Sequence, residues 1–451
     1  MSTSSRSLTL REHARRTVAL AVPVTIGRIS IFGLVVEDTA MTGRSSAQEL
    51  AYYSLANGPL SPLLLIGIGI MMGVVVFSAQ SAGRGKLAEC GQIWRLGLGL
   101  GLLVGAVMAS LGHAGEWFLL LTGQASDLAS GAGSAIILLA WGLPAVFVFA
   151  ACTFFLEGLN RPLPGMVVMV GANGINIFLN WLLINGNLGL PALGADGAAL
   201  ATTLTRWAVA VAIVVYILTS LDHRTYGVSG PMPDARPLLT RLVRLGVPLA
   251  IALALESSSF ATMTLLSGLL GPVQVSAFAI GFNLIAIVFM TAIGFATSAS
   301  VRVANAIGRG DGPGVGTAGW TAVGIAAGLL GVSALVIAGF NEWFAGLYTT
   351  DAAVIAVAAP TIALAALALV PDGSQGAIGG ALRGASDVWP ATGLYLLSFW
   401  LVMVPLGYYI GIHLGRGAPG LMLAVFAGAT VAVILLGARF HTVARRAASA
   451  A

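Results

Sequence analysis

Residues 52–80 read YYSLANGPLSPLLLIGIGIMMGVVVFSAQ, and none of these side chains is Asp, Glu, Lys, Arg or His. An uncharged apolar stretch of this length can cross the hydrocarbon core of a bilayer, which takes roughly 20 helical residues. Because a backbone in hydrocarbon must satisfy its own hydrogen bonds, the stretch is expected to be helical. It therefore predicts a transmembrane helix.

Eleven further segments along the chain are long enough and predominantly apolar, although some of them contain isolated charged residues. The predicted spans are residues 17–38, 52–80, 94–112, 131–157, 164–185, 195–220, 241–268, 275–300, 316–340, 354–382, 391–412 and 419–438. Of the 451 residues, 57% are apolar and 9% are charged, whereas a soluble domain carries roughly 25% charged residues. This composition excludes a soluble enzyme, a nucleic-acid-binding protein and a secreted disulfide scaffold. We predict an all-α polytopic membrane protein with twelve transmembrane helices.

The Lys and Arg residues are sorted by loop. With an even number of spans and a cytoplasmic N-terminus, eighteen of them fall in cytoplasmic segments and only Arg44 and Arg416 in external loops. Positively charged loops are retained in the cytoplasm, so both termini are predicted to be cytoplasmic. The first apolar stretch, from about Thr17 to Val36, has no small-residue cleavage site after it. It is therefore expected to be a span and not a signal peptide.

The two halves of the chain repeat each other. When Val22-Pro23 is aligned with Val247-Pro248, the same shift aligns Gly43 with Gly268, Gly69 with Gly294, and Gly83-Arg84-Gly85 with Gly308-Arg309-Gly310. Six spans separate equivalent positions, so both halves enter the membrane in the same direction, as a parallel repeat. We predict a six-helix lobe of residues 1–221, a cytoplasmic linker of residues 222–237 and a second six-helix lobe of residues 238–451. Repeated halves of this kind are typical of secondary transporters.

Two acidic residues of the second half are predicted at similar depths in the membrane. Glu256 lies twelve residues after Arg244 and Asp372 eleven residues before Arg383, which corresponds to about 18 Å and about 16 Å of helix. No Lys or Arg lies at that depth in the second half, so the two acids are protonated, neutralised by a cation, or held neutral by hydrogen bonds. Ser257, next to Glu256, either allows close helix approach or ligates a cation.

The first half carries ionisable residues of both signs inside its spans. Glu37 and Asp38 are adjacent, and since neighbouring helical positions point about 100° apart, one of them is expected to face the bundle interior. Arg28 and Arg206 are the intramembrane cations. Either they neutralise Asp38, Glu37 or Glu157 structurally, or Asp38 is a proton- or substrate-responsive group whose pairing changes between states.

Two amide side chains of the fifth span are expected to share a helix face. Asn176 and Asn180 are four residues apart, which places them on one side of a helix. They could line a polar cavity or bridge neighbouring helices.

The chain offers no set of residues for chemistry at the membrane midplane. The five histidines, His13, His113, His223, His413 and His441, are all expected in terminal or loop regions. The two cysteines, Cys90 and Cys152, have no metal-binding spacing. We therefore predict that the protein is not an enzyme and has no metal cluster or cofactor.

Several of these residues stand in motifs that resemble those of the multidrug and toxic compound extrusion (MATE) family, and the resemblance covers nearly the whole chain. The motifs resemble those of the family's first, fifth, sixth, seventh, tenth and eleventh helices: Pro23 with Asp38-Thr39, Met41 and Gly43; Asn176-Ile-Phe-Leu-Asn180; Gly194-Ala-Asp-Gly197-Ala-Ala-Leu-Ala-Thr202; Leu245-Gly-Val-Pro248 with Glu256; Asp372-Gly-Ser-Gln375 with Leu382-Arg383-Gly384 and Asp387; and Pro405-Leu-Gly407-Tyr408.

The resemblance implies a V-shaped, two-lobed monomer in the bacterial inner membrane. It also implies export of small organic cations against an inward flow of Na⁺ or H⁺, with membrane lipid and no nucleic acid as partner. Glu256 and Asp372 together are similar to the NorM-like branch, where they form the cation site of the second lobe, with Na⁺ as the candidate metal ion. Asp38 matches the coupling residue of the DinF branch. The expected cavity residues are Asn176, Asn180, Glu37, Ser257 and Gln375.

The chain departs from the family pattern at three positions. Glu37 is an extra acid, and Arg28 is an extra charge in the first helix. Ala368 stands where some relatives carry an aromatic hydroxyl, which leaves the choice between Na⁺ and H⁺ open. The alternative function is a lipid-linked precursor flippase of the same superfamily, which would need a cationic cavity for pyrophosphate. The acids of the second half argue against it, whereas Arg28 and Arg206 keep it open.

Overall fold

The computed structural model describes residues 9–230, 232 and 235–450. Within this part of the chain every regular element is helical, and twelve helical segments are long and apolar enough to cross a membrane. This confirms the predicted all-α fold and the number of spans. Each apolar segment closes its backbone hydrogen bonds within itself, which is what a hydrocarbon environment requires.

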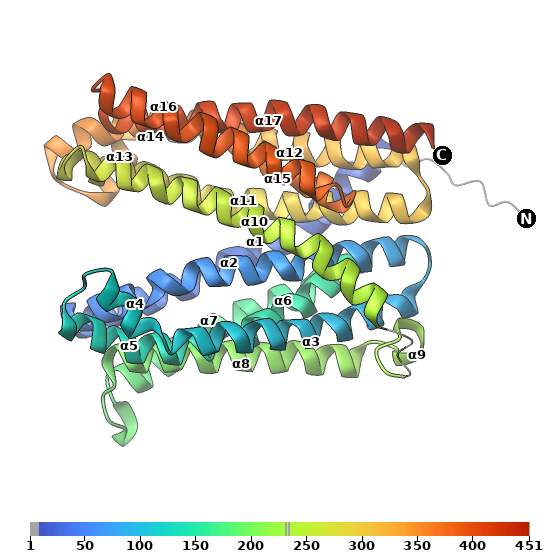
Figure 1. Ribbon diagram of the computed structural model, residues 1–451, viewed down its shortest axis with the longest axis horizontal. Coiled ribbons are helices and arrows are strands. Elements are labelled where there is room, and N and C mark those ends of the chain that lie inside the picture. Colours follow the sequence, from blue (N-terminus) through green and yellow to red (C-terminus); the bar gives the residue numbers. More distant parts are fainter. Residues whose placement is uncertain (1–8, 231, 233–234, 451) are drawn as a thin grey trace, which may run out of the picture. The chain divides into compact units, whose positions relative to one another are not determined.

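The helices follow one another with short connections (Figure 1). The first half contains α1 (Leu10–Ser45), α2 (Ala47–Gly83), α3 (Leu87–Gly112), α4 (Gly115–Leu121), α5 (Ser126–Ala140), α6 (Leu143–Gly158), α7 (Leu163–Ile184), η1 (Asn187–Gly189), α8 (Gly194–Ser220) and α9 (His223–Tyr226). The second half contains α10 (Arg236–Gly268), α11 (Pro272–Arg309), α12 (Gly312–Gly339), α13 (Asn341–Tyr348), α14 (Ala352–Gly384), α15 (Val388–Tyr395), η2 (Leu396–Met403), α16 (Val404–Gly407), η3 (Tyr408–His413) and α17 (Gly417–Ser449).

Contacts divide the chain into two compact units that share two helices. The first unit is Ile26–Ala250, and the second unit joins the chain up to Thr25 to the part that begins at Ile251. Helix α1 therefore begins in the unit formed mostly by the second half of the chain. Helix α10 begins in the unit formed mostly by the first half. Thr25 and Ala250 are equivalent in the sequence repeat, so both boundaries fall at the same place in the two halves. The predicted lobe limits at residues 221 and 238 stay a prediction.

Each shared helix makes a close contact at a glycine. A Cβ on Gly69 of α2 would lie 2.5 Å from the Cα of Ala250 in α10. A Cβ on Gly294 of α11 would lie 2.0 Å from Oγ1 of Thr25 in α1. Small residues let membrane helices approach this closely. Gly69 and Gly294 are equivalent in the repeat, as are Ala250 and Thr25. The two halves therefore make the same close helix contact at equivalent positions.

The fourth span was expected to be one helix, but it consists of two. Helices α5 and α6 are separated at Trp141, shortly before Pro144, which has no backbone N–H to continue the helical hydrogen bonds. Side chains of α8 donate to carbonyl groups at the break: Thr203 Oγ1 to Leu138 at 2.7 Å, and Trp207 Nε1 to Trp141 at 3.1 Å. Side chains of α8 therefore satisfy these two carbonyl groups at the break.

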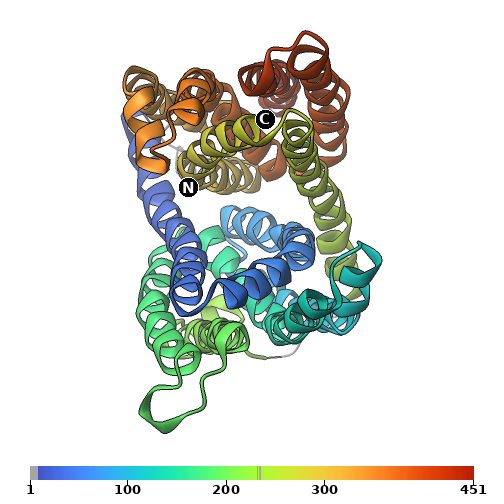
Figure 2. The ribbon, with the colours of Figure 1, turned by 90° about the vertical axis from the view of Figure 1, so that its left-hand side faces the viewer.

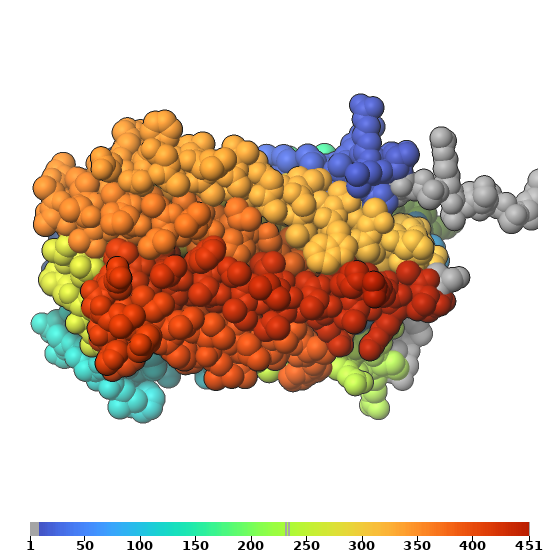
Figure 3. All heavy atoms as spheres, turned by 90° about the horizontal axis from the view of Figure 1, so that it is seen from above, coloured from blue at the N-terminus to red at the C-terminus, as the bar shows by residue number. Residues whose placement is uncertain are grey.

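The core of each unit is made by helices that pack side by side (Figure 2). In the first unit, α6 packs against α2, α3 and α8, and α7 packs against α8. In the second unit, α14 packs against α11, α12 and α17, and Figure 3 shows α17, in red, lying along α12 to α14, in orange. Of these helices, α14 carries Asp372 and Gln375, α7 carries Asn180, and α8 carries Thr202.

Candidate functional site

Helices α10 and α14 bring together the two acids predicted in the second unit. Nε2 of Gln375 donates to Oε1 of Glu256 at 3.1 Å and to Oδ1 of Asp372 at 3.3 Å. Asp372 is 4% exposed and Gln375 is 1% exposed. Gln375 follows Asp372 by one helical turn, which places both side chains on one face of α14. The amide therefore links the acids of two different helices.

This cluster holds more hydrogen-bond acceptors than donors. The carboxylates use the amide donors of Gln375, and the buried Oε1 of Gln375 has no hydrogen-bond partner among the described residues. No Lys, Arg or His forms an ion pair with Glu256 or Asp372 in the described part of the chain. Two such carboxylates are favourable only when protons or a bound cation neutralise them. The arrangement is suited to taking up cations.

The eleventh span contributes two aromatic residues that the sequence analysis missed. Nε1 of Trp400, in the π-helical segment η2, donates to the carbonyl of Leu255 at 3.0 Å, one residue before Glu256. The hydroxyl of Tyr395 lies beside Gly379 of α14, where a Cβ would be 2.2 Å from that oxygen. Neither aromatic residue is near the acids in sequence, so no spacing indicated them.

Ser257, a predicted cavity residue, contributes no side-chain oxygen to this cluster, and Ala368 lacks one, as the sequence indicates. No hydrogen bond joins Ser257 to either acid in the described structure. The neighbouring Ser259 donates to the backbone carbonyl of Glu256 at 2.7 Å, which satisfies a helix carbonyl. Ala368 is fully buried and presents only a methyl group.

A second polar cluster surrounds Asp38 in the first unit. Its carboxylate accepts hydrogen bonds from the Tyr53 hydroxyl at 2.7 Å, from Nδ2 of Asn180 at 2.7 Å and from Oγ1 of Thr202 at 2.6 Å. Nδ2 of Asn180 also donates to Oδ1 of Asn176 at 2.9 Å. All five side chains are buried. One carboxylate therefore connects α1, α2, α7 and α8.

The sequence analysis identified only part of this second cluster. The sequence predicts Asp38, Asn176 and Asn180 as functional residues. Thr202 belongs to the motif of residues 194–202 that resembles the family's sixth helix, but the sequence assigns it no role. Tyr53 was missed, because a tyrosine near the start of an apolar span carries no distinctive signal. Glu37 is half-buried outside the cluster, and its Oε2 has no partner among the described residues. Of the two adjacent acids, only Asp38 faces the cluster, as their angular separation predicts.

Neither intramembrane arginine forms an ion pair or a hydrogen bond with the acids of the two clusters among the described residues, although Arg206 lies near enough to Asp38 and Tyr53 to interact with them electrostatically. Nη2 of Arg28 is 3.7 Å from Oε1 of Glu157, and its Cζ lies 5.5 Å from the ring centroid of Phe154. Nη1 of Arg206 donates to the carbonyl of Leu139 at 3.2 Å. Of the pairings left open by the sequence, the structure therefore contains the one between Arg28 and Glu157.

Of the five histidines predicted in terminal or loop regions, His113 lies in a connection between helices, whereas the other four stand in helical elements, His223 in α9 and His413 at the end of η3. His13 lies within α1 and is 5% exposed, and His441 lies within α17. The helices continue past the ends of the apolar segments, so a boundary drawn from hydropathy stopped short of these residues.

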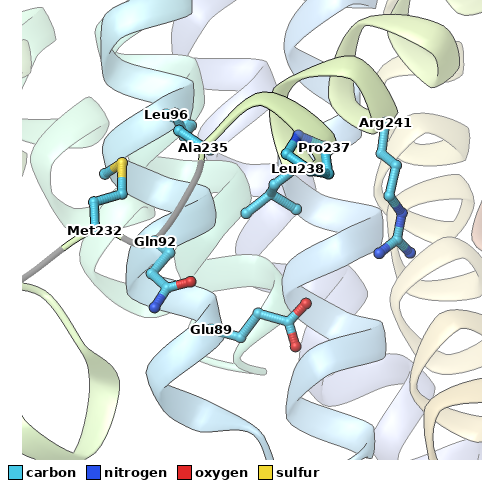
Figure 4. Close-up of a pocket in the computed structure, with 8 residues that line it drawn as sticks. All are labelled: Glu89, Gln92, Leu96, Met232, Ala235, Pro237, Leu238 and Arg241. Carbon is cyan, nitrogen blue, oxygen red and sulfur yellow. The ribbon is translucent and has the colours of Figure 1, made fainter.

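A hollow of about 240 Å³ lies elsewhere in the first unit, at the start of α3 (Figure 4). Its lining includes Glu89, Gln92 and Leu96 of α3 and Leu238 of α10. Glu89 forms an ion pair with Arg84 at 3.6 Å, so the hollow presents no uncompensated acid. None of the predicted site residues lines it, and the two acid clusters remain the candidate cation sites.

Comparison with known proteins relates this arrangement to one family. The MatE family model matches residues 23–182 and 248–409, and the two matched segments begin at equivalent positions of the repeat. The chain is 36% identical to the probable multidrug resistance protein NorM of Caulobacter vibrioides, over 94% of this chain and 90% of that protein. It is 30% identical to the multidrug resistance protein NorM of Vibrio cholerae, over 96% of each.

Solved structures share the fold. The chain aligns with the eukaryotic MATE transporter AtDTX14 at a TM-score of 0.87 and 22% identity, over 97% of this chain and 98% of that one. It aligns with a MOP superfamily transporter from Pyrococcus furiosus at a TM-score of 0.86 and 19% identity, over 96% of each chain. At these identities the likeness shows the fold alone.

Proposed function

The chain belongs to the MatE family, and from this premise we propose that it is an antiporter that exports small organic cations against an inward flow of Na⁺ or H⁺. Two of its relatives are named multidrug resistance proteins, which supports a broad range of exported compounds. The excess of Lys and Arg in alternate loops supports an orientation in the bacterial inner membrane with both termini in the cytoplasm.

The observation that carries this proposal is the cluster of Glu256, Gln375 and Asp372. Its two carboxylates share one neutral amide and have no cationic partner among the described residues. A coupling cation or an organic cation can supply the missing positive charge. A ligand shifts a conformational equilibrium only by its different affinities for the two states. Because each cation neutralises the same acids, binding of one weakens binding of the other, which is the coupling that exchange requires.

Asp38 is the second cation-responsive group in this proposal. Its carboxylate accepts hydrogen bonds from three side chains on three other helices. A protonated carboxyl is a weaker acceptor than a carboxylate. Proton uptake by Asp38 would therefore loosen the contacts that connect α1 with α2, α7 and α8, and loss of the proton would restore them.

The flippase alternative has less support. It would require a cationic surface for pyrophosphate, and the candidates for that role were Arg28 and Arg206. Arg28 lies beside Glu157, and Arg206 donates to a backbone carbonyl at the break in the fourth span. Both arginines already have partners within the protein, whereas the acids of the second unit have no cationic partner in the described residues.

The test is transport in proteoliposomes that contain the purified protein. Efflux of a fluorescent organic cation is measured under an imposed Na⁺ gradient with pH clamped, and then under a pH gradient without Na⁺. We expect one gradient to drive wild-type efflux, and we expect Asp372→Asn and Glu256→Gln to reduce it to the rate of empty liposomes. Glu342→Gln, at an exposed acid of α13, is the matched control and should transport normally.

Two outcomes would contradict the proposal. Full efflux by normally inserted Asp372→Asn would remove this acid from the mechanism. Absence of wild-type efflux under both gradients would overturn the assignment of organic cations as substrates and leave lipid-linked precursors as the next compounds to assay.

A further inference from the structure

The first turns of α1 are attached to α11 by a buried polar cluster outside both acid sites. The guanidinium of Arg302 donates to Nδ1 of His13 and to Oγ1 of Thr17. Oγ of Ser298 donates to the carbonyl of Thr17 at 3.0 Å. His13 is 5% exposed and Arg302 is 8% exposed, and Thr17 and Ser298 are fully buried. Four polar side chains therefore meet at this contact.

The internal repeat provides a comparison for this contact. The residues equivalent to His13, Thr17, Ser298 and Arg302 in the other half are Leu238, Leu242, Gly73 and Phe77. They lie at the matching contact of α10 with α2, where the backbones approach in the same way. A Cβ on Gly73 would lie 3.0 Å from the carbonyl oxygen of Leu242, the counterpart of the bond from Ser298 to Thr17.

At the contact of α10 with α2, apolar side chains are sufficient to hold the two helices together. Leu242 is fully buried and Phe77 is 5% exposed, Leu238 is half-buried, and the Arg241 guanidinium lies 4.8 Å from the centroid of the Phe77 ring. The α10 contact therefore forms without any hydrogen bond between these four side chains. Apolar side chains of similar volume often replace buried charged groups without loss of stability. The polar residues at the α1 contact are therefore not needed for packing, and their chemistry calls for a separate explanation.

The hydrogen bonds determine the protonation state of His13 in this arrangement. A guanidinium has only donors, so Nδ1 of His13 must present a lone pair to Arg302, and the imidazole is neutral. A proton on Nδ1 would turn this acceptor into a donor and place an imidazolium against the guanidinium. Both the lost hydrogen bond and the repulsion between buried like charges would oppose the contact.

The other charged groups near His13 add to this effect. They are Arg309 of α11, Asp311 before α12, and Arg16 on α1 itself. Asp311 is already engaged, since it lies 3.3 Å from Arg309 and accepts from the N–H of Gly314 at 2.9 Å. Among the described residues the charged groups around His13 are therefore positive overall, and the one carboxylate among them, Asp311, is already engaged.

We propose that His13 is a regulatory proton-binding site, whose protonation breaks the contact with Arg302 and releases the start of α1, residues 10–25, from α11. The four equivalent side chains at the α10 contact do not titrate, so this contact stays docked. Histidine changes its charge within the physiological pH range, so the release responds to acidification on the side of the membrane where the chain begins. The inference does not depend on which ion drives transport.

The test is hydrogen–deuterium exchange of the full-length protein in lipid nanodiscs, measured at about pH 5.5 and about pH 7.5, on either side of the usual histidine titration. Protection is compared between peptides from residues 10–25 and from residues 236–250, after correction for the intrinsic exchange rate. We expect protection of residues 10–25 to fall by about tenfold at the lower pH, since a hydrogen bond to a charged group contributes at least that factor. Protection of residues 236–250 should not change.

Variants separate His13 from other titrating groups. His13→Asn keeps a hydrogen-bond acceptor but cannot take up a proton, so protection of residues 10–25 should become independent of pH. His441→Asn, at an exposed histidine of α17, should behave as the wild type. Equal protection of residues 10–25 at both pH values in the wild type would overturn the proposal. So would a pH dependence that persists in His13→Asn. The wild-type comparison needs no variant, so it can still overturn the proposal even if His13→Asn is unstable.

Discussion

Replacing Thr202 with Val changes a hydroxyl into a methyl group of nearly the same shape within the Asp38 cluster. Oγ1 of Thr202 donates to Oδ2 of Asp38 at 2.6 Å, and Thr202 is 4% exposed. Hydrogen bonds to charged groups contribute about 1.5–3 kcal/mol to stability. Asp38 keeps its other donors, Tyr53 and Asn180. We therefore expect the free energy of unfolding to fall by about 2 kcal/mol.

Thr205→Val, on the same helix, is the matched control. Thr205 is fully buried, and its Oγ1 has no hydrogen-bond partner among the described residues. The change removes a polar group that makes no bond and replaces it with an apolar group of equal size. Stability should stay the same or rise by up to about 1 kcal/mol, because burying an unpaired hydroxyl is unfavourable.

The assay is thermal unfolding of the purified variants in detergent, followed by intrinsic tryptophan fluorescence. Adding Asp38→Asn completes a double-mutant cycle, which isolates the interaction between Asp38 and Thr202. In the Asp38→Asn background, Thr202→Val should have less than half of its effect, because hydrogen bonds to a charged acceptor are roughly twice as strong as neutral ones. Equal destabilisation by the two Val variants would refute the reasoning, as would an unchanged effect of Thr202→Val in the Asn background.

Two further predictions concern the second unit. Gly379→Ala should displace the Tyr395 hydroxyl, since a Cβ would lie 2.2 Å from it, and should lower efflux at limiting coupling-ion concentration. Gly376→Ala, whose Cβ meets nothing closer than 3.7 Å, is the control, and equal efflux by the two variants would contradict the prediction. Asp387→Asn weakens a paired contact with Arg439 at 2.7 and 2.8 Å. It should lower the free energy of unfolding by about 1 kcal/mol, because both side chains are partly exposed. An unchanged thermal unfolding midpoint would count against it.

The two halves of the chain share one kind of helix contact but differ in the polar cluster around His13. The equivalent glycines Gly69 and Gly294 make equivalent contacts, so the two halves use one scheme to dock their first helices. The polar cluster around His13 breaks that equivalence at the contact of α1 with α11. Two repeated halves with one titratable contact can respond to protons at one shared helix while the other remains in place.

Local patterns in the sequence determined the membrane class, the twelve spans and the internal repeat, and they predict similar depths for Glu256 and Asp372. Each of these depends on the chemistry of a single segment or on its spacing along the chain. Apolar composition makes a helix suited to hydrocarbon, and the constant rise of a helix converts spacing into depth. The face shared by Asn176 and Asn180 followed from helical periodicity in the same way.

The partners of these residues were decided only by the tertiary structure. Gln375 lies between Glu256 and Asp372, and Tyr53 reaches Asp38, because helices distant in sequence pack at particular rotations and heights. Spacing within one helix contains no information about which face of another helix lies opposite. The same reason explains His13, whose isolated position in the sequence suggested a terminus, whereas packing of α1 against α11 buries it beside Arg302.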